Sequence, residues 1–287
     1  FGVAPGTGSK TNPNAMATVQ HDTIFTNVAL RPDGTVWWEG HDDPAPSSAE
    51  DWRGKPWTPN SGHPAAHPNS RFTTSIKQCP TYSSEWEKPQ GVPISAILFG
   101  ARRNKLVPLV YQSFNWQHGT FLGATLASET TAAATGAVGV VRRDPMAMLP
   151  FCGYNMGDYW AHWLSMAQRA THPPKIFRVN WFQRNEQGRF IWPGFGENLR
   201  VLRWVVERCK GGGEAEETPI GYVPKLSALN GGDLKVSKSD LNQLVAIDRE
   251  GWKSNLRSQG EYFDNFGDHL PAGIKEEHRA LANRLKG

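Results

Sequence analysis

The stretch that decides the fold is KIFRVNWFQRNEQGRFIWPGFGENLRVLRWVVERC, residues 175–209. Its first part, 175–182, is rich in β-branched and aromatic residues, as a buried strand is. Turn residues follow, and apolar side chains then recur at helical spacing over 199–209, with glycines at 211–213 as the stop. The apolar face of this predicted helix consists of Leu199, Leu202, Val205, Val206 and Cys209.

Further strands are predicted upstream of this stretch. Residues 23–29 and 35–38 flank a Pro-Asp-Gly turn, and the proline-rich residues 41–92 are expected to be mostly loop. Two apolar runs, 94–99 and 107–111, predict buried strands.

Two further helices are predicted, one at 158–169 and one that begins near Pro271. The second carries Ile274, His278, Leu281 and Leu285 on one face. Because strands and helices mix without strict alternation, the predicted fold class is mixed α/β (α+β).

Composition limits the function classes. The chain has 287 residues, 38% of them apolar and 20% charged, which fits one large or two ordinary globular domains. No apolar run reaches transmembrane length, so no membrane association is expected. The net charge of +4 is scattered, which favours a small anionic substrate over nucleic acid. The first residue is not Met, so we expect a processed chain or a fragment.

Two residue types are informative by number. The three cysteines, Cys79, Cys152 and Cys209, are widely spaced, which predicts a reducing compartment and hence a cytoplasmic location. Twelve tryptophans are unusual, and aromatic side chains often build flat binding walls.

The loop from Gly2 to Thr11, GVAPGTGSKT, has two interpretations. It resembles a phosphate loop, but Ser9 separates Gly8 from Lys10, whereas that motif needs glycine directly before lysine. It is therefore either a structural or substrate-lining loop, or a loop that holds phosphate through backbone N–H groups. Further along, His63 and His67 are each followed by proline, which forbids the helix that would aim both rings at one metal.

Two arginine segments are candidate anion sites. In His67-Pro68-Asn69-Ser70-Arg71 a proline-stiffened loop can present a fixed guanidinium, although a surface arginine in a turn fits as well. Arg102 and Arg103 follow a predicted strand and a glycine, where α/β sheets bind ligands. Two solvated arginines remain the alternative.

The last two segments predict a mobile loop and an aromatic clamp. Residues 128–139, SETTAAATGAVG, bury little, as a lid or an ordinary loop does. Phe182, Phe190 and Phe195 lie close in sequence, where a flat ring could slot between them, although core packing is the default for phenylalanine. Asn198 could read the edge of a base, but its amide can flip to suit guanine or adenine unless a neighbour fixes it.

These segments together resemble the GTP-dependent phosphoenolpyruvate carboxykinases, in details such as SETTAAATG the bacterial ones. The matching stretches run in family order from residue 1 to about residue 225: FGVAPGT, KTNPNAM, TIFTNVA, GKPW, AHPNSRF, QCP, FGARR, VPLVYQSFNW, SETTAAA, DPMAM, PFCGYNMGDY, VNWF, FIWPGFGEN and ETPIGYVPK. The resemblance covers the C-terminal half of that enzyme. Its phosphate-binding loop, manganese ligands and N-terminal domain would lie upstream of Phe1.

The resemblance implies a role for each matching residue. Arg71 and Arg102 are implied as catalytic. Asn69, Arg71, Arg103, Gly2 and Gly6 would bind oxaloacetate or phosphoenolpyruvate. Ser128, Thr130, Thr131, Ala132, Ala133, Ala134, Gly136 and Gly139 would belong to a lid over the site. Arg102, Trp181, Phe182, Phe190, Phe195 and Asn198 would bind the nucleotide. Where many members carry charged lid residues, this chain has Thr135 to Val138, which puts any lid contact made by those charges in doubt.

The resemblance also implies two interleaved lobes. Residues 1–7 and 92–184 would form the phosphoenolpyruvate-binding lobe, and residues 8–91 and 185–287 the nucleotide-binding lobe. The implied reaction converts oxaloacetate and GTP into phosphoenolpyruvate, CO2 and GDP, as in gluconeogenesis, with Mn2+ and Mg2+–GTP and with no metal ligand in this chain. The missing N-terminal half would be a partner, and the full-length protein a monomer.

Two alternatives remain open from the sequence. The chain could be a noncatalytic guanine-nucleotide-binding fragment, because the base clamp is present and the metal ligands are not. It could also be a tryptophan-rich module that stacks sugars, which would be expected in a secreted chain.

Overall fold

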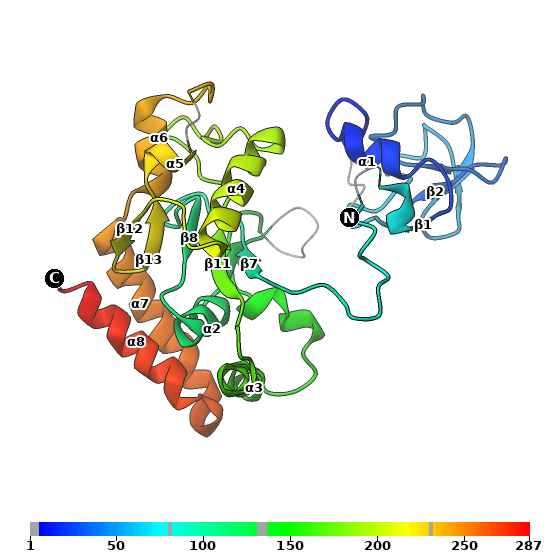
Figure 1. Cartoon of the computed structure of the whole chain (residues 1–287). Coiled ribbons are helices and arrows are strands. Elements are labelled where there is room, and N and C mark those ends of the chain that lie inside the picture. The colour runs from blue at the N-terminus through cyan, green and yellow to red at the C-terminus, as the bar shows by residue number, and fades with distance from the viewer. Residues whose placement is uncertain (1–5, 80–81, 131–136, 230–231) are drawn as a thin grey trace. The chain divides into compact units, whose positions relative to one another are not determined.

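The computed structural model of the chain describes residues 6–79, 82–130, 137–229 and 232–287, without the side chain of Phe195. Within these limits the chain forms two compact units (Figure 1). Unit 1 comprises residues 6–92, and unit 2 comprises residues 93–130 and 137–287.

Unit 2 is built on a five-stranded sheet with the order β12-β13-β8-β11-β7. Its strands are β7 (Ala96–Gly100), β8 (Val110–Gln112), β11 (Lys175–Val179), β12 (Ala215–Thr218) and β13 (Gly221–Pro224). Strands β11 and β7 are parallel, and the other pairs are antiparallel. The parallel pair places the carboxyl ends of β7 and β11 at the same edge of the sheet.

Helices cover both faces of this sheet (Figure 1). One face packs against α2 (Trp116–Ala124), α3 (Met156–Arg169), α7 (Arg249–Phe263) and α8 (Ala272–Arg284). The other packs against α4 (Asn198–Cys209), α5 (Leu226–Leu229) and α6 (Lys238–Val245). Successive side chains of β11 point to opposite faces of the sheet, so Ile176 packs in the first core and Phe177 in the second.

The remaining elements of unit 2 are short. An antiparallel pair, β9 (Ala127–Glu129) and β10 (Val141–Arg143), stands apart from the main sheet. Four 3-10 helices are η2 (Pro145–Ala147), η3 (Leu149–Phe151), η4 (Phe195–Glu197) and η5 (Asp264–His269).

Unit 1 contains two small antiparallel sheets and little helix. One has the order β3-β2-β4-β5, and the other pairs β1 with β6. The bounds are α1 (Pro13–Thr18), β1 (Thr23–Thr26), β2 (Ala29–Leu30), β3 (Val36–Trp37), β4 (Ala49–Glu50), β5 (Pro56–Trp57), β6 (Arg71–Thr74) and η1 (Ile76–Gln78). One part of its core packs tryptophans against alanines, with the rings of Trp37 and Trp57 5.6 Å apart.

The predicted fold class, mixed α/β, is confirmed, and the differences are local. The strand predicted at 23–29 is divided, because Asn27 has a φ of 60° and separates β1 from β2. The predicted apolar face of 199–209 is right for Val205 and Cys209 and wrong for Leu199, Leu202 and Val206. Val201, Trp204 and Val205 are buried, whereas Leu199 and Val206 are exposed. The large Trp204 indole decides the face, because it packs against Phe177 of the sheet.

The interleaved lobes remain a prediction. The two units divide the described chain near residue 92. The predicted lobes would also include the N-terminal half of the protein, so the structure of this chain does not test them.

Candidate functional site

The carboxyl ends of β7 and β11 bring two predicted site residues together. Val179 is the register partner of Gly100, and the backbone N–H of Ala101 donates to the Val179 carbonyl at 3.4 Å. Arg102 and Phe182 each come shortly after their strand, and the Arg102 guanidinium lies 5.3 Å from the centroid of the Phe182 ring. A cation stacked on a ring at the carboxyl edge of an α/β sheet suits a planar anionic ligand.

A second aromatic ring continues this stack. The Phe182 and Phe190 rings are 5.9 Å apart and nearly perpendicular. Phe190 is 52% exposed, and the Arg184 guanidinium covers it at 4.2 Å. Arg102, Phe182, Phe190 and Arg184 therefore form a continuous row, here called the aromatic edge.

A short hairpin holds Phe190 in place. Arg184 and Phe190 form a β-bridge, and the Asn185 side chain accepts from the Arg189 N–H at 3.0 Å. Gly188 takes a φ of 75°, which a residue with a Cβ adopts only with strain. The turn thus returns Phe190 to the neighbourhood of Phe182.

Asn180 fixes both strand ends with one buried amide. Its Oδ1 accepts from the backbone N–H of Arg103 and of Phe182, both at 3.2 Å. Its Nδ2 donates to the carbonyls of Arg103, at 2.9 Å, and Val107, at 2.8 Å. The side chain is fully hydrogen-bonded, so the backbones that carry Arg102 and Phe182 form one rigid assembly.

Asn198 lies at the start of α4, and a tryptophan orients it. The indole Nε1 of Trp192 donates to Asn198 Oδ1 at 2.8 Å. An indole nitrogen only donates, so the atom that faces it must be the amide oxygen. The amide therefore presents its NH2 group on its other side. The orientation of the Asn198 amide, which the sequence left undetermined, is thus fixed.

Arg103 lies in other surroundings than Arg102. Arg102 is exposed beside Phe182, whereas Arg103 is partly buried near Arg178 and Arg143. Burial, together with these two positive neighbours, lowers the pKa of Arg103 to about 10. The two adjacent arginines thus have different neighbours.

The backbone of Arg102 is hydrogen-bonded to the base of the predicted lid. Ser128 Oγ accepts from the Arg102 N–H at 3.1 Å, and the Glu129 N–H donates to the Arg102 carbonyl at 2.9 Å. The base is closed by bonds from the Thr130 N–H to the Val140 carbonyl and from the Gly139 N–H to the Thr130 carbonyl, each 2.9 Å. The predicted lid residues Thr131, Ala132, Ala133, Ala134 and Gly136 lie outside the described residues.

In unit 1, Asn69 and Arg71 lie at the entrance to β6. A turn from His67 to Ser70 places them, with the Asn69 N–H donating to His67 Nδ1 at 2.9 Å. Arg71 is exposed, and its guanidinium donates to the Ser70 carbonyl at 2.9 Å. His63 contacts Asp51, at 3.2 Å, and His67 packs on Trp52, so the two rings have different partners.

The glycine-rich loop of unit 1 uses its N–H groups internally. The Ser9 N–H donates to Asp42 Oδ1 at 3.0 Å, and the Gly8 N–H donates to Thr11 Oγ1 at 3.1 Å. Thr11 Oγ1 donates to the Gly6 carbonyl at 2.7 Å. A carboxylate on these donors favours the structural interpretation of the loop over phosphate binding. Gly2 lies outside the described residues.

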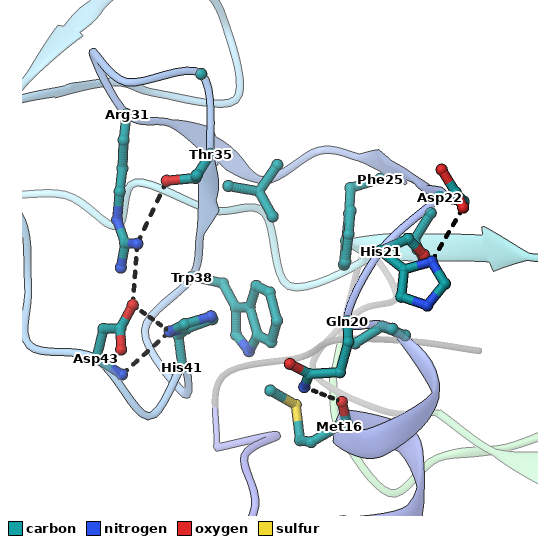
Figure 2. A pocket seen from close by; sticks show the side chains of 14 residues that line it. Met16, Gln20, His21, Asp22, Phe25, Arg31, Thr35, Trp38, His41 and Asp43 are labelled. Carbon is teal, nitrogen blue, oxygen red and sulfur yellow. Dashed lines mark hydrogen bonds and ion pairs between the residues drawn. The ribbon is translucent and has the colours of Figure 1, made fainter. Parts of the chain in front are cut away.

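Unit 1 also contains a pocket of about 490 Å3 (Figure 2). Arg31, Asp43 and His41 lie on one side of it, Phe25 lies on the other, and Trp38 lies between them. Arg31 is already paired with Asp43 at 3.0 Å, so the pocket offers little free positive charge. Its described lining includes none of the predicted site residues.

Neither a metal cluster nor a membrane span is found in the described part of the chain. Three or more His, Cys, Asp or Glu side chains do not converge there as a metal ion would require. None of the described helices combines the length and apolar composition that crossing a bilayer requires.

Comparison with known proteins places the chain in a family. Residues 1–284 match the model of the phosphoenolpyruvate carboxykinase C-terminal P-loop domain. The chain belongs to this carboxykinase family. It is 54% identical over 286 residues to "Phosphoenolpyruvate carboxykinase [GTP]" of Anaeromyxobacter dehalogenans (strain 2CP-C), and 52% identical over 288 residues to the protein of that name from Chlamydia pneumoniae. Each match covers 100% of this chain and 48% of the relative, so the chain spans about half the length of these relatives.

The resemblance to the carboxykinases is therefore confirmed, and the structure brings some of the predicted residues together. Arg102, Phe182 and Phe190 lie in the aromatic edge. Trp181 is half-buried against the core beneath α4. The side chain of Phe195 lies outside the described residues.

Sequence reasoning missed three residues of this carboxykinase domain. Arg184 covers Phe190, Asn180 joins the two strand ends, and Trp192 orients Asn198. A signal existed for Asn180, because a polar residue directly after a buried strand must find partners. The high number of tryptophans reflects core packing more than binding walls, since seven of the twelve are buried: Trp37, Trp38, Trp57, Trp160, Trp192, Trp204 and Trp252. This disfavours the sugar-stacking alternative.

Proposed function

We propose that this chain supplies the guanine-binding edge and substrate arginines of a GTP-dependent phosphoenolpyruvate carboxykinase. The intact protein would convert oxaloacetate and GTP into phosphoenolpyruvate, CO2 and GDP. The family match and the printed names of the relatives support this proposal. The observation within the chain that carries it is the hydrogen bond from the Trp192 indole to Asn198, which fixes the orientation of the Asn198 amide.

The fixed amide favours guanine over adenine. With Oδ1 held by Trp192, Asn198 offers N–H donors to a base. Guanine carries an acceptor at O6, where adenine carries an amino donor at N6. A donor against O6 forms a hydrogen bond, whereas a donor against N6 is repelled. Phe182 and Phe190 would stack on the base, with Trp181 and Phe195 as further walls.

The arginines would stabilise the charge that builds up in the reaction. Loss of CO2 from oxaloacetate leaves an enolate, whose oxygen attacks the γ-phosphoryl group while GDP departs. Arg102 would contact the phosphoryl group, and Asn69 and Arg71 the substrate carboxylates, with Gly2 and Gly6 lining the cleft. The Arg102 backbone is held at both its N–H and its carbonyl, which limits the positions that its side chain can take before the reaction begins.

A closing lid has a chemical reason in this reaction. Water that reaches the enolate would protonate it to pyruvate and waste the substrate. We assign residues 128–139 to the lid that excludes water. The hydrogen bonds between its base and Arg102 would let closure and phosphoryl contact occur together.

Metal chemistry is not placed on this chain. The described residues offer no cluster that fits Mn2+ or Mg2+. As part of this proposal, we place the metal ligands in the rest of the protein. For the same reason we expect the chain alone to be a guanine-nucleotide-binding fragment without turnover. The cytoplasmic location and the monomeric state of the full-length protein remain predictions.

The base specificity can be tested on the 287-residue chain. Titration with guanosine, GTP and adenosine, followed by tryptophan fluorescence, should give similar affinities of roughly millimolar order for the first two, since stacking contributes about 1 to 3 kcal/mol per base. Phe182→Ala should weaken both, and Phe151→Ala, at a 77% exposed position that is not one of the four residues of the aromatic edge, should change neither. Equal binding of adenosine and guanosine by the folded chain would contradict the proposed guanine site.

A second assay separates the activity from the binding. Purified chain with manganese, GTP and oxaloacetate should form no phosphoenolpyruvate. Turnover comparable with that of a full-length carboxykinase would show that the chain holds a metal site of its own.

A further inference from the structure

Three arginines of unit 2 gather on the sheet face that packs against α7. Arg178 lies on β11, opposite Tyr111 of β8, and is 2% exposed. Arg103 follows β7, and Arg143 ends β10. Burial lowers the pKa of Arg103 and of Arg143 to about 10 each, and the nearby charge of Arg178 contributes to both shifts. The three charges are therefore close enough to repel one another.

Acidic side chains do not neutralise this arginine cluster. In the described part of the chain, the arginines found in ion pairs with carboxylates are Arg31, Arg200, Arg203 and Arg284. Glu129 is the carboxylate that favours the charge of Arg103, but its Oε1 already accepts from the Asn104 N–H at 2.7 Å.

The cluster also has unused hydrogen-bonding capacity. The Nε atoms of Arg103 and Arg178 are buried, and neither has a partner among the described residues. A buried N–H on a charged group without an acceptor is costly, so an acceptor from outside the chain would be stabilised here.

A pocket of about 320 Å3 opens beside Arg103 and Arg143. Helix α7 lines its other side with Ser254, Asn255 and Ser258. Ser258 Oγ accepts from the Arg143 guanidinium at 2.8 Å, and a second Arg143 nitrogen donates to the Thr125 carbonyl at 3.2 Å. Arg143 is thus held in position, and Leu106, Val141 and Gly251 complete the lining.

We infer that this pocket binds a phosphate-sized oxyanion between Arg103 and α7. Two guanidinium groups match the charge of a phosphate dianion and supply directed N–H donors, and the hydroxyl and amide groups of α7 can donate to its remaining oxygens. The ligand is either inorganic phosphate or the phosphate group of a monoester, since both present the same oxygens.

Charge in the pocket provides the test. Thermal unfolding of the 287-residue chain should occur at a higher temperature in phosphate than in chloride of the same ionic strength, because a ligand of the folded state stabilises it. Ser254→Glu introduces a carboxylate beside the arginines, so it should raise the midpoint in chloride and weaken phosphate binding by about tenfold or more. Ser165→Glu, on the exposed part of α3, should leave the phosphate effect intact.

The outcomes separate the possibilities. Methyl phosphate as effective as inorganic phosphate would mean that a monoester fits, and a weaker effect would restrict the site to the free ion. If Ser254→Glu prevents folding, Asn255→Asp places the charge one residue further along α7 and should have the same effect. The inference is overturned if phosphate and chloride give the same midpoint, or if the Glu and Asp variants keep the full phosphate effect.

Discussion

Trp192 fixes the direction in which Asn198 can donate a hydrogen bond. The two residues lie six positions apart, on either side of η4, and the indole Nε1 reaches Asn198 Oδ1 at 2.8 Å. Trp192 is only 2% exposed, so the indole cannot readily turn away. A buried aromatic residue thereby controls the polar group that the proposed function places against the base.

Trp192→Phe tests this control. The variant keeps an aromatic ring but loses the donor, so the Asn198 amide can present either atom to a base. We expect the preference for guanosine over adenosine to fall by about tenfold, which is the effect of one hydrogen bond of about 1.4 kcal/mol. Equilibrium dialysis with both nucleosides measures it. Trp204→Phe is the matched control, because Trp204 is a buried indole of the same core that has no assigned contact with the base, and an equal fall in that variant would assign the effect to lost packing.

Asn180→Asp tests the joint between the two strand ends. An Asp side chain keeps the oxygen that accepts from Arg103 and Phe182 but sets a second oxygen against the Arg103 and Val107 carbonyls. We expect a loss of about 2 to 3 kcal/mol in the free energy of unfolding, measured with denaturant. Asn185→Asp is the control, because Asn185 Oδ1 acts there as an acceptor from Arg189, which a carboxylate also satisfies. Equal losses in both variants would contradict the assigned role of Asn180.

The sequence predicted the parts of the aromatic edge better than their arrangement. Buried runs followed by Arg102 and by Phe182 were recognisable, because strand ends carry ligands in α/β sheets. That β7 and β11 are neighbours and parallel was not, since strand pairing depends on contacts between residues far apart in sequence. The sequence offered Arg102 and Arg103 as one candidate anion segment, and the structure gives their side chains different neighbours.

The role of Trp192 could not be predicted for a different reason. A tryptophan after an apolar residue indicates core packing, and Trp192 is indeed buried. Its functional contact is made by the one polar atom of the ring, and the turn through η4 decides whether that atom meets Asn198. Helix α4 shows the same limit, because the buried Trp204 overrides the face that the smaller apolar residues indicated.

Arg102→Lys and Arg103→Lys should separate the two arginines in the intact protein. Lysine keeps the charge but loses the planar fork, so the loss at Arg102 should reach about a hundredfold in turnover if this residue holds the phosphoryl group. At Arg103 we expect a smaller loss, because that side chain lies towards Arg143 and Arg178. Steady-state phosphoenolpyruvate formation measures both. A larger loss at Arg103 would reverse the assignment.

His118 should make the stability of unit 2 sensitive to acid. The ring is 1% exposed on α2, and burial, with a smaller contribution from the charge of Arg284, lowers its pKa from 6.5 to about 3. As pH falls below about 6.5, the unfolded chain gains a proton at this residue and the folded chain does not, so stability is full above that pH and decreases below it. Each pH unit corresponds to about 1.4 kcal/mol, which predicts a loss of about 2 kcal/mol between pH 7.5 and about pH 5.

Denaturant unfolding of wild type and His118→Gln at both pH values isolates this contribution. The variant has no titrating group at this position, so its stability should fall by about 2 kcal/mol less than that of wild type over the same range. The comparison cancels the opposite contribution of His269, whose pKa is raised by its hydrogen bond to Asp158 and which therefore stabilises the folded chain at low pH. His172→Gln, at an exposed position, should retain the wild-type slope. If His118→Gln retained that slope as well, the buried ring would have to accept a proton in the folded state, and the hydrogen bond from the Phe114 N–H to its Nδ1 would have to open to allow it.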